Sequence, residues 1–190
     1  MTLVEALDSL TTLCHQFESV FGSGSLDERL RRQIAEGQNV WSRTNYGGHL
    51  TATAIVTDPA CSSVLLIKNK ALNRWLAPGG HCEYLEAPSA AAGRELREET
   101  GLASAGMHRW HQANEFIPID IDCHVIPANP AKKEPQHYHH DFRYVFVLED
   151  AQQDLQTDGK EIEGWKYADL ALAAPDYPRV IERLLQWKQF

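Results

Sequence analysis

Residues 80–102 constrain the fold of this chain more than any other segment. They read GHCEYLEAPSAAAGRELREETGL. Pro88 suits the first turn of a helix, where its missing N–H costs nothing, and Gly101 suits the left-handed residue that ends one. The segment therefore predicts a helix from about residue 88 to about residue 100, preceded by a glycine-containing turn.

Three carboxylates, those of Glu95, Glu98 and Glu99, fall within an arc of roughly 100° on this helix. Like charges at these spacings repel one another, and partial burial strengthens the repulsion. Arg94 lies four residues before Glu98 and can neutralise one charge, which leaves at least two. Because hard divalent cations prefer oxygen ligands, we expect Mg²⁺ or Mn²⁺ here. The alternative, a solvated acidic helix face, requires neither the leading glycine nor the arginine.

The segment matches the Nudix box at every defined position from Gly80 to Leu102, Glu86 included. The chain therefore resembles the Nudix hydrolase family, over about residues 49–169. It looks like a subgroup with a His-rich HxHHD strand and an N-terminal helical arm. The resemblance implies an α/β fold, a Nudix-type α/β/α sandwich with a mixed sheet plus the N-terminal extension. It also implies metal-dependent hydrolysis of a pyrophosphate bond in a nucleoside diphosphate linked to another moiety, such as a nucleotide, a nucleotide sugar or a dinucleotide.

The resemblance also implies roles for individual residues. The expected catalytic residues are Glu95, Glu98 and Arg94, and the expected metal ligands are Gly79 (through its carbonyl), Glu95, Glu98 and Glu99, with Gly80 and Glu86 in support. Glu95 is either a ligand or the base that takes a proton from water, since family members differ on the base. A further ligand outside the box is common, and Glu161, Glu163 and Glu115 are the candidates, each against the alternative of a surface charge.

The run HYHHDFRY is the second informative segment. Read with the period of a strand, His137, His139, Asp141 and Arg143 share one face. Two histidines and an aspartate can hold a metal, whereas His, Asp and Arg together can bind phosphate or ribose. We expect substrate binding ahead of a second metal site. The alternative is a partly exposed edge with an ordinary Asp141–Arg143 ion pair.

The pattern along the chain divides it into an N-terminal helical extension, residues 1–45, and a Nudix domain, residues 46–190. The extension predicts a helix over 2–20 and a second one through about residue 35, for which Ser25 and Glu28 form a capping box. The predicted elements of the domain are strands at 51–58, 62–69, 106–117, 120–126, 141–150 and 163–170, a loop at 127–136 and a final helix at 178–188.

Composition excludes several function classes. The net charge of −8 over 190 residues disfavours a nucleic-acid surface, which needs Lys and Arg. No apolar run approaches the length of a membrane span, and the N-terminus lacks a secretory signal, so we expect a cytoplasmic protein. Four scattered cysteines suggest neither a zinc knuckle nor a disulfide framework. The expected partner is a small phosphorylated substrate, with a homodimer through the helical arm as an open possibility.

Two other readings remain open. An isopentenyl-diphosphate isomerase-like enzyme of the same fold needs a differently spaced box and a catalytic cysteine partnered by metal-binding histidines, and Cys82 follows the PGG turn. A non-catalytic nucleotide-sensing regulatory domain would ordinarily have lost carboxylates of the box. Here every box carboxylate is present, so hydrolysis is preferred.

Overall fold

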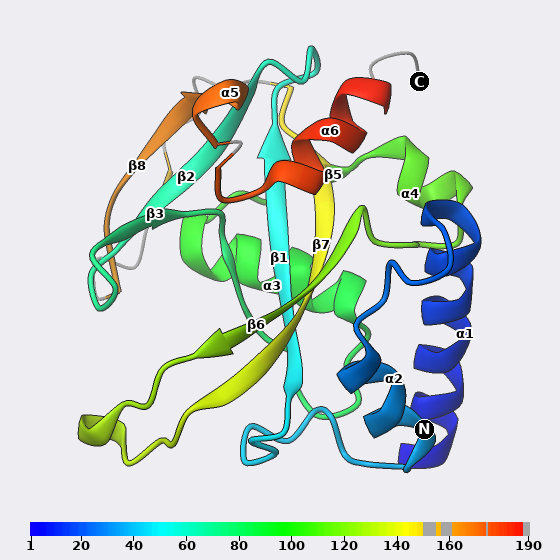
Figure 1. The fold of residues 1–190 in the computed structure, drawn as a ribbon. Coiled ribbons are helices and arrows are strands. Elements are labelled where there is room, and N and C mark those ends of the chain that lie inside the picture. The colour runs from blue at the N-terminus through cyan, green and yellow to red at the C-terminus, as the bar shows by residue number, and fades with distance from the viewer. Residues whose placement is uncertain (150–154, 157–160, 174, 188–190) are drawn as a thin grey trace.

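The computed structural model describes residues 1–149, 155–156, 161–173 and 175–187. Helices flank a mixed sheet of eight strands (Figure 1). The strands are β1 (His49–Thr57), β2 (Ser63–Asn69), β3 (Arg74–Leu76), β4 (Gly79–His81), β5 (Gly106–Met107), β6 (Asp120–Ile126), β7 (His137–Val147) and β8 (Ile162–Asp169). The helices are α1 (Leu3–Phe21), α2 (Glu28–Ala35), α3 (Pro88–Thr100), α4 (Arg109–Ala113), α5 (Leu170–Ala173) and α6 (Pro178–Trp187), with a 3₁₀ turn at Pro130–Lys132.

Strands β1 and β7 form the centre of the sheet. The main strand order is β3-β2-β1-β7-β5, while β4 pairs with β1, β6 with β7 and β8 with β2. The β1–β7 pair is parallel and the other pairs are antiparallel. Both central strands are buried over most of their length, as expected for strands covered on two faces. In Figure 1, α3 lies behind β1 and β7 and α6 lies in front, which confirms the expected sandwich.

The N-terminal arm is helical, as predicted, and its apolar stripe joins the main core. Leu7, Leu10 and Phe17 of α1 are buried in the same cluster as the sheet residues. An ion pair of 2.7 Å between Arg31 of α2 and Glu18 of α1 joins the two helices. The hydrogen bond from Arg31 lowers the pKa of Glu18 to about 2. The arm therefore packs as part of the domain's core.

The capping box predicted for the second helix lies at the first helix instead. The predicted Ser25–Glu28 box does not form, because α2 begins after Asp27, whose side chain accepts a hydrogen bond from the N–H of Arg29. The capping box of this arm belongs to α1, between Thr2 and Glu5. An aspartate placed directly before the first helical turn satisfies the free N–H groups there without Ser25.

The strand predicted at 106–117 is also wrong. Within this stretch the described strand is β5, which is two residues long and pairs with β7. The chain then forms α4. Tertiary contacts explain the difference, since Trp110 stacks on Trp187 with ring centroids 4.0 Å apart. His111 is buried, and its Nε2 accepts the N–H of Val145. The predicted strands at 51–58, 62–69, 120–126 and 163–170 correspond to β1, β2, β6 and β8.

Strand β7 begins at His137, four residues before the predicted start, and residue 150 lies outside the described residues. The final helix starts at Pro178, as predicted, while residue 188 lies outside the described part of the chain. Among the described helices, none combines the length and apolar character that crossing a bilayer requires. The four cysteines are free thiols.

Candidate active site

Helix α3 presents the carboxylates of the box to the turn that carries β4. Pro88 occupies its first turn, and Gly101 ends it in the left-handed conformation with φ of 70°. Ala92 and Leu96 are buried against the sheet. Because the acidic positions lie next to this apolar stripe, helix packing turns them toward Gly79 and Gly80, which pair with β1.

Arg94 organises the acidic cluster. Its Nε and Nη2 donate to the two carboxylate oxygens of Glu86 at 3.0 and 2.9 Å. Its Nη1 donates to Glu95 at 2.8 Å and to Glu98 at 3.0 Å. Nη2 also reaches the carbonyl of His81 at 2.9 Å. One guanidinium therefore fixes three carboxylates and the β4 backbone, which the planar fork of arginine makes possible.

Gly79 and Gly80, at the start of the box, allow the carboxylates to approach the backbone closely. The N–H of Gly79 donates to Glu99 at 2.8 Å. A Cβ on Gly80 would lie 2.5 Å from the Glu95 carboxyl carbon, so a side chain there would occupy the space of the carboxylate. Burial raises the pKa of Glu95, against the lowering effect of Arg94. Negative charge at Glu95 is thus only partly compensated by the protein.

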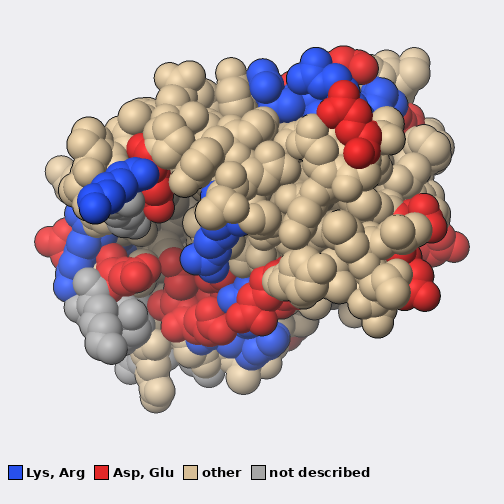
Figure 2. All heavy atoms as spheres, turned by 90° about the horizontal axis from the view of Figure 1, so that it is seen from below, with Lys and Arg blue, Asp and Glu red and all other residues tan. Residues whose placement is uncertain are grey.

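A cavity of about 700 Å³ lies beside this cluster. It is lined by Gly79 and by the box residues Gly80, Glu95 and Glu99. From the rest of the chain it is lined by residues that include Thr51, Thr53, Asp122, His124, His139, Asp141, Arg143, Glu161, Tyr177, Arg43 and Arg74. In Figure 2 the molecule is hollowed on one face, where Asp and Glu side chains gather with Lys and Arg side chains beside them. The cavity can therefore receive a phosphorylated ligand only if its acidic wall is neutralised.

The box residues divide between the cavity wall and its support. Glu98 does not line the cavity, since its side chain is 57 % exposed and pairs with Arg94. Glu86 also lies off the wall, where it accepts the N–H of Glu83 as well as Arg94. This contact links Glu86 to the loop that enters α3.

In the second predicted group, on β7, His137, Asp141 and Arg143 are buried and His139 is half-buried. Strand β7 lies between β1 and β6, so the predicted alternative of an exposed edge is wrong, whereas the Asp141–Arg143 ion pair of that alternative is present. Arg143 donates to Asp141 at 2.9 Å, Asp120 at 3.1 Å and Asp122 at 3.0 Å. The charges of these aspartates outweigh burial and raise the pKa of Arg143. A hydrogen bond from His124, and also the charge of Arg143, lower the pKa of Asp122 below its ordinary 3.8. Asp141 and Arg143 form an ion pair, and both still line the cavity.

Strand register explains how these side chains meet. In the parallel β1–β7 ladder, Thr51 lies beside Asp141 and Thr53 beside Arg143. Both threonine hydroxyls donate to Asp141, at 3.3 and 2.8 Å. Sequence reasoning missed the partners on β1 and β6, namely His49, Thr51, Thr53, Asp120, Asp122 and His124. The signal was present as polar residues at every second position of both strands, on the face that β7 continues.

The three candidates for an additional ligand lie in different places. Glu161 lines the cavity. Glu163 is exposed on β8 and does not line it. Glu115 lies in a separate cavity of about 320 Å³ and is hydrogen-bonded to Gln16. The structure therefore brings only Glu161 to the cavity that the box residues share.

The residues of the box fit a hard divalent cation. Glu95 and Glu99 supply carboxylate oxygens, and Gly80 leaves the space beside them free of a side chain. Burial raises the pKa of Glu95, so a cation beside it would stabilise the ionised carboxylate. Oxygen ligands of this kind suit Mg²⁺ and Mn²⁺ better than softer metals.

Comparison with known proteins agrees with this geometry. The family model of the NUDIX domain matches residues 47–188. A probable DHNTP pyrophosphohydrolase of Lactococcus lactis is 31% identical over 125 residues, which are 65% of this chain and 69% of that protein. An RNA pyrophosphohydrolase of Sphingopyxis alaskensis is 30% identical over 96 residues, covering 50% and 61% of the two chains. The fold resembles that of an Ap4A hydrolase of C. elegans, with a TM-score of 0.54 and 19% identity over 73% of this chain and 96% of that one. The chain belongs to the Nudix family and is a hydrolase of pyrophosphate bonds.

Proposed function

We propose that the protein hydrolyses a pyrophosphate bond of a small nucleotide-like substrate, with Mg²⁺ or Mn²⁺ held by Glu95, Glu98, Glu99 and the carbonyl of Gly79. The observation that supports this most is the placement of Glu95 and Glu99 on the wall of the 700 Å³ cavity. Arg94 and the Gly79 N–H hold them there. When bound, the metal would shield the phosphate charge and lower the pKa of the attacking water.

The protein's own residues prepare the site for that chemistry. Arg94 keeps Glu95 in place next to Gly80, and Glu86 in turn fixes two of the guanidinium nitrogens. Glu98 is more exposed, and one of its carboxylate oxygens accepts a hydrogen bond from Arg94 at 3.0 Å. Arg94 is thus a positioning residue, because it acts through the carboxylates that it holds.

Substrate binding is proposed for the part of the cavity wall outside the box. Arg43 and Arg74 line the cavity and carry exposed guanidinium groups that suit phosphate oxygens. His139 lines it as well, whereas Asp141 and Arg143 are committed to their ion pairs and shape the wall. We therefore assign Asp141 and Arg143 a structural contribution to the binding site.

The relatives suggest which substrates to test first. Their names refer to DHNTP, RNA and Ap4A. We propose a phosphoanhydride joined to a heterocyclic group as the substrate class. The panel therefore contains DHNTP, nucleoside triphosphates, dinucleoside polyphosphates and nucleotide sugars, each with Mg²⁺ and with Mn²⁺. Phosphate released after a phosphatase step is the readout.

Glu99→Gln tests the metal assignment, with Glu163→Gln as the matched control on an exposed site away from the cavity. On the best substrate we expect Glu99→Gln to lose at least about 100-fold in kcat/KM and Glu163→Gln to keep the wild-type value. A chelator should abolish turnover, and added Mg²⁺ should restore it. Full activity in the chelator, or in Glu99→Gln, would contradict the proposal.

Glu95→Gln separates the two roles left open for that residue. If Glu95 is a ligand, the concentration of Mg²⁺ needed for half-maximal activity rises. If it is the base, kcat falls while that concentration stays the same.

The structure gives the isomerase reading no support. Cys82, its candidate cysteine, is 2 % exposed, and burial raises the pKa of its thiol. A reactive thiolate needs the opposite environment. We also propose that residues 1–45 form an extension of a domain that comprises residues 46–190. The extension contributes to the core.

A further inference from the structure

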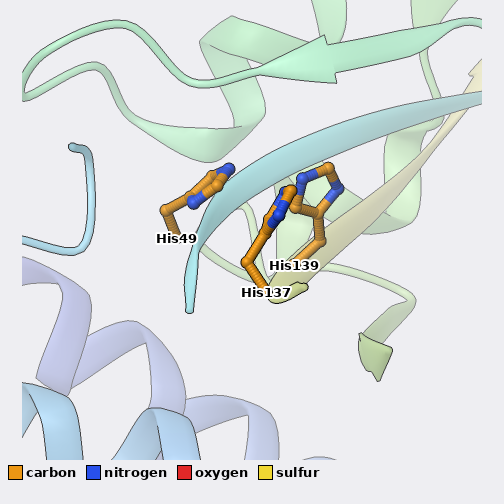
Figure 3. Close-up of side chains that lie close together, drawn as sticks. All are labelled: His49, His137 and His139. Atoms are coloured by element: carbon orange, nitrogen blue, oxygen red, sulfur yellow. The ribbon is translucent and has the colours of Figure 1, made fainter. Parts of the chain in front are cut away.

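Three histidines outside the proposed Mg²⁺ site lie together at the N-terminal end of the central strands. His49 begins β1, and His137 and His139 lie on β7 (Figure 3). One ring nitrogen from each lies within 4.8 Å of those of the other two. Their ring centroids are 4.7 to 5.2 Å apart. The parallel register places His49 directly beside His139, and His137 follows on the same face.

Hydrogen bonds fix which nitrogen of two of these rings is free to bind. His137 Nδ1 lies 2.9 Å from the carbonyl oxygen of Pro135, and His49 Nδ1 lies 3.3 Å from that of Asn45. Because a carbonyl only accepts, each Nδ1 carries the proton and each Nε2 carries a lone pair. Metal-binding histidines are oriented by this kind of contact between the other ring nitrogen and a backbone carbonyl.

The cluster leaves lone pairs without partners. Among the described residues, the buried Nε2 atoms of His49 and His139 have no hydrogen-bond partner. A buried polar atom left in this state costs about 1–3 kcal/mol. A metal ion that accepts lone pairs from His49 and His139 would satisfy both of these atoms, and the Nε2 of His137 would supply a third ligand.

Burial favours the neutral form of two of the rings. Burial, followed by the neighbouring His49, His81, His124 and His137, lowers the pKa of His139 to about 2. Burial also lowers the pKa of His49. Metals bind the neutral form of imidazole.

The ligand type separates this cluster from the carboxylates of the box. Imidazole nitrogen suits Zn²⁺ and neighbouring transition metals, whereas Mg²⁺ prefers oxygen. Three histidines leave one position of a tetrahedral site open. His139 lines the same cavity as Glu95 and Glu99, so that position would face the space assigned to the substrate.

We propose that His49, His137 and His139 form a transition-metal site of the Zn²⁺ type at the wall of this cavity, separate from the Mg²⁺ site of the box. The ion would take its fourth ligand from water or from an oxygen of the bound substrate. Its binding does not depend on hydrolysis.

Co²⁺ is a suitable probe, because nitrogen coordination in a four-coordinate site gives visible absorption bands. The purified full-length protein, stripped with a chelator, is titrated with Co²⁺, which Zn²⁺ then displaces. We expect one equivalent to bind in the presence of excess Mg²⁺. His139→Gln should weaken binding at least about 100-fold. The matched control His15→Gln, at an exposed position of α1, should stay within about threefold of the wild type.

Two further variants make the result decisive. Glu99→Gln should keep the Co²⁺ site, and loss of binding in that variant would place the ion at the box and overturn the proposal. Equal binding by wild type and His139→Gln would overturn it as well. If circular dichroism shows that His139→Gln is unfolded, His137→Gln replaces it, and Zn²⁺ should raise the Tm of the wild type but not of this variant.

Discussion

Gly80→Ala tests whether the glycine of the box exists to make room for Glu95. The added Cβ would lie 2.5 Å from the Glu95 carboxyl carbon and 2.6 Å from both of its oxygens. Ordinary contact begins at about 3.4 Å, so the carboxylate must move by about 0.9 Å. A misplacement of about 1 Å in an active site costs up to about 100-fold in rate, or about 2.7 kcal/mol in the barrier.

The fold should tolerate the same change. Gly80 has no positive φ, and the atoms that a Cβ would meet belong to the flexible end of a side chain. We therefore expect the free energy of unfolding to change by less than about 1 kcal/mol. Gly79→Ala is the matched control, because its Cβ would lie 2.6 Å from the backbone oxygen of Ala52. That variant should lose about 1–3 kcal/mol of stability.

The assay compares kcat/KM on the best substrate with urea unfolding for both variants. Gly80→Ala should lose activity at nearly unchanged stability, and Gly79→Ala should lose stability. A Gly80→Ala enzyme with the wild-type rate would refute the reasoning about Glu95. Equal destabilisation of the two variants would refute the distinction between a side-chain and a backbone neighbour.

Three further outcomes follow from the buried groups. Glu95→Gln should raise the Tm at pH 7.5 without divalent metal, because the raised pKa makes the ionised carboxylate unfavourable to folding above its ordinary value of 4.5. The gain should vanish below pH 4.5, where both states are protonated. Arg143→Met should cost about 3–5 kcal/mol in urea unfolding at pH 7, because the buried Asp141 loses its cation, whereas Asp120 and Asp122 keep their ion pairs with Arg179. Phe17→Ala should cost about 3–5 kcal/mol by opening a cavity under α1, whereas Val4→Ala, at an exposed position, should change little.

Each of these has an outcome that would contradict it. A Tm gain for Glu95→Gln that persists at pH 4 would show that its charge is not the cause. An Arg143→Met variant as stable as the wild type would mean that the ion-pair network contributes nothing to folding. Similar losses in Phe17→Ala and Val4→Ala would mean that the N-terminal arm is not anchored by its buried stripe.

Local signals allowed much of the fold to be predicted from the sequence. Pro88 and Gly101 fix the two ends of α3 through backbone conformation alone, so the helix was predicted at its observed position. Alternation along β7 placed His139 and Arg143 on one face, because every second side chain of a strand points to the same side. Local chemistry failed where tertiary contacts decide, as at Trp110, whose stacking on Trp187 helps hold a helix where a strand was predicted.

The candidate site was predicted only in part because it needs the partners of each strand. The box carries its own spacing, and therefore Glu95 and Glu99 were found. His49 was not, because nothing local indicates that β1 runs parallel to β7 and begins beside His139. Asp120 and Asp122 were missed for the same reason, as their role depends on Arg143 of the neighbouring strand.

The parallel pairing of β1 with β7 also has a kinetic consequence. The elements β2, β3, β4, α3, β5, α4 and β6 lie between these strands in the chain, so the contacts of β1 with β7 join residues that are far apart in the sequence. Contacts of this kind form slowly, because the long intervening loop must close first. During refolding, helical signal should therefore recover before ligand binding does, and the appearance of activity should report the moment at which the last strands come into register.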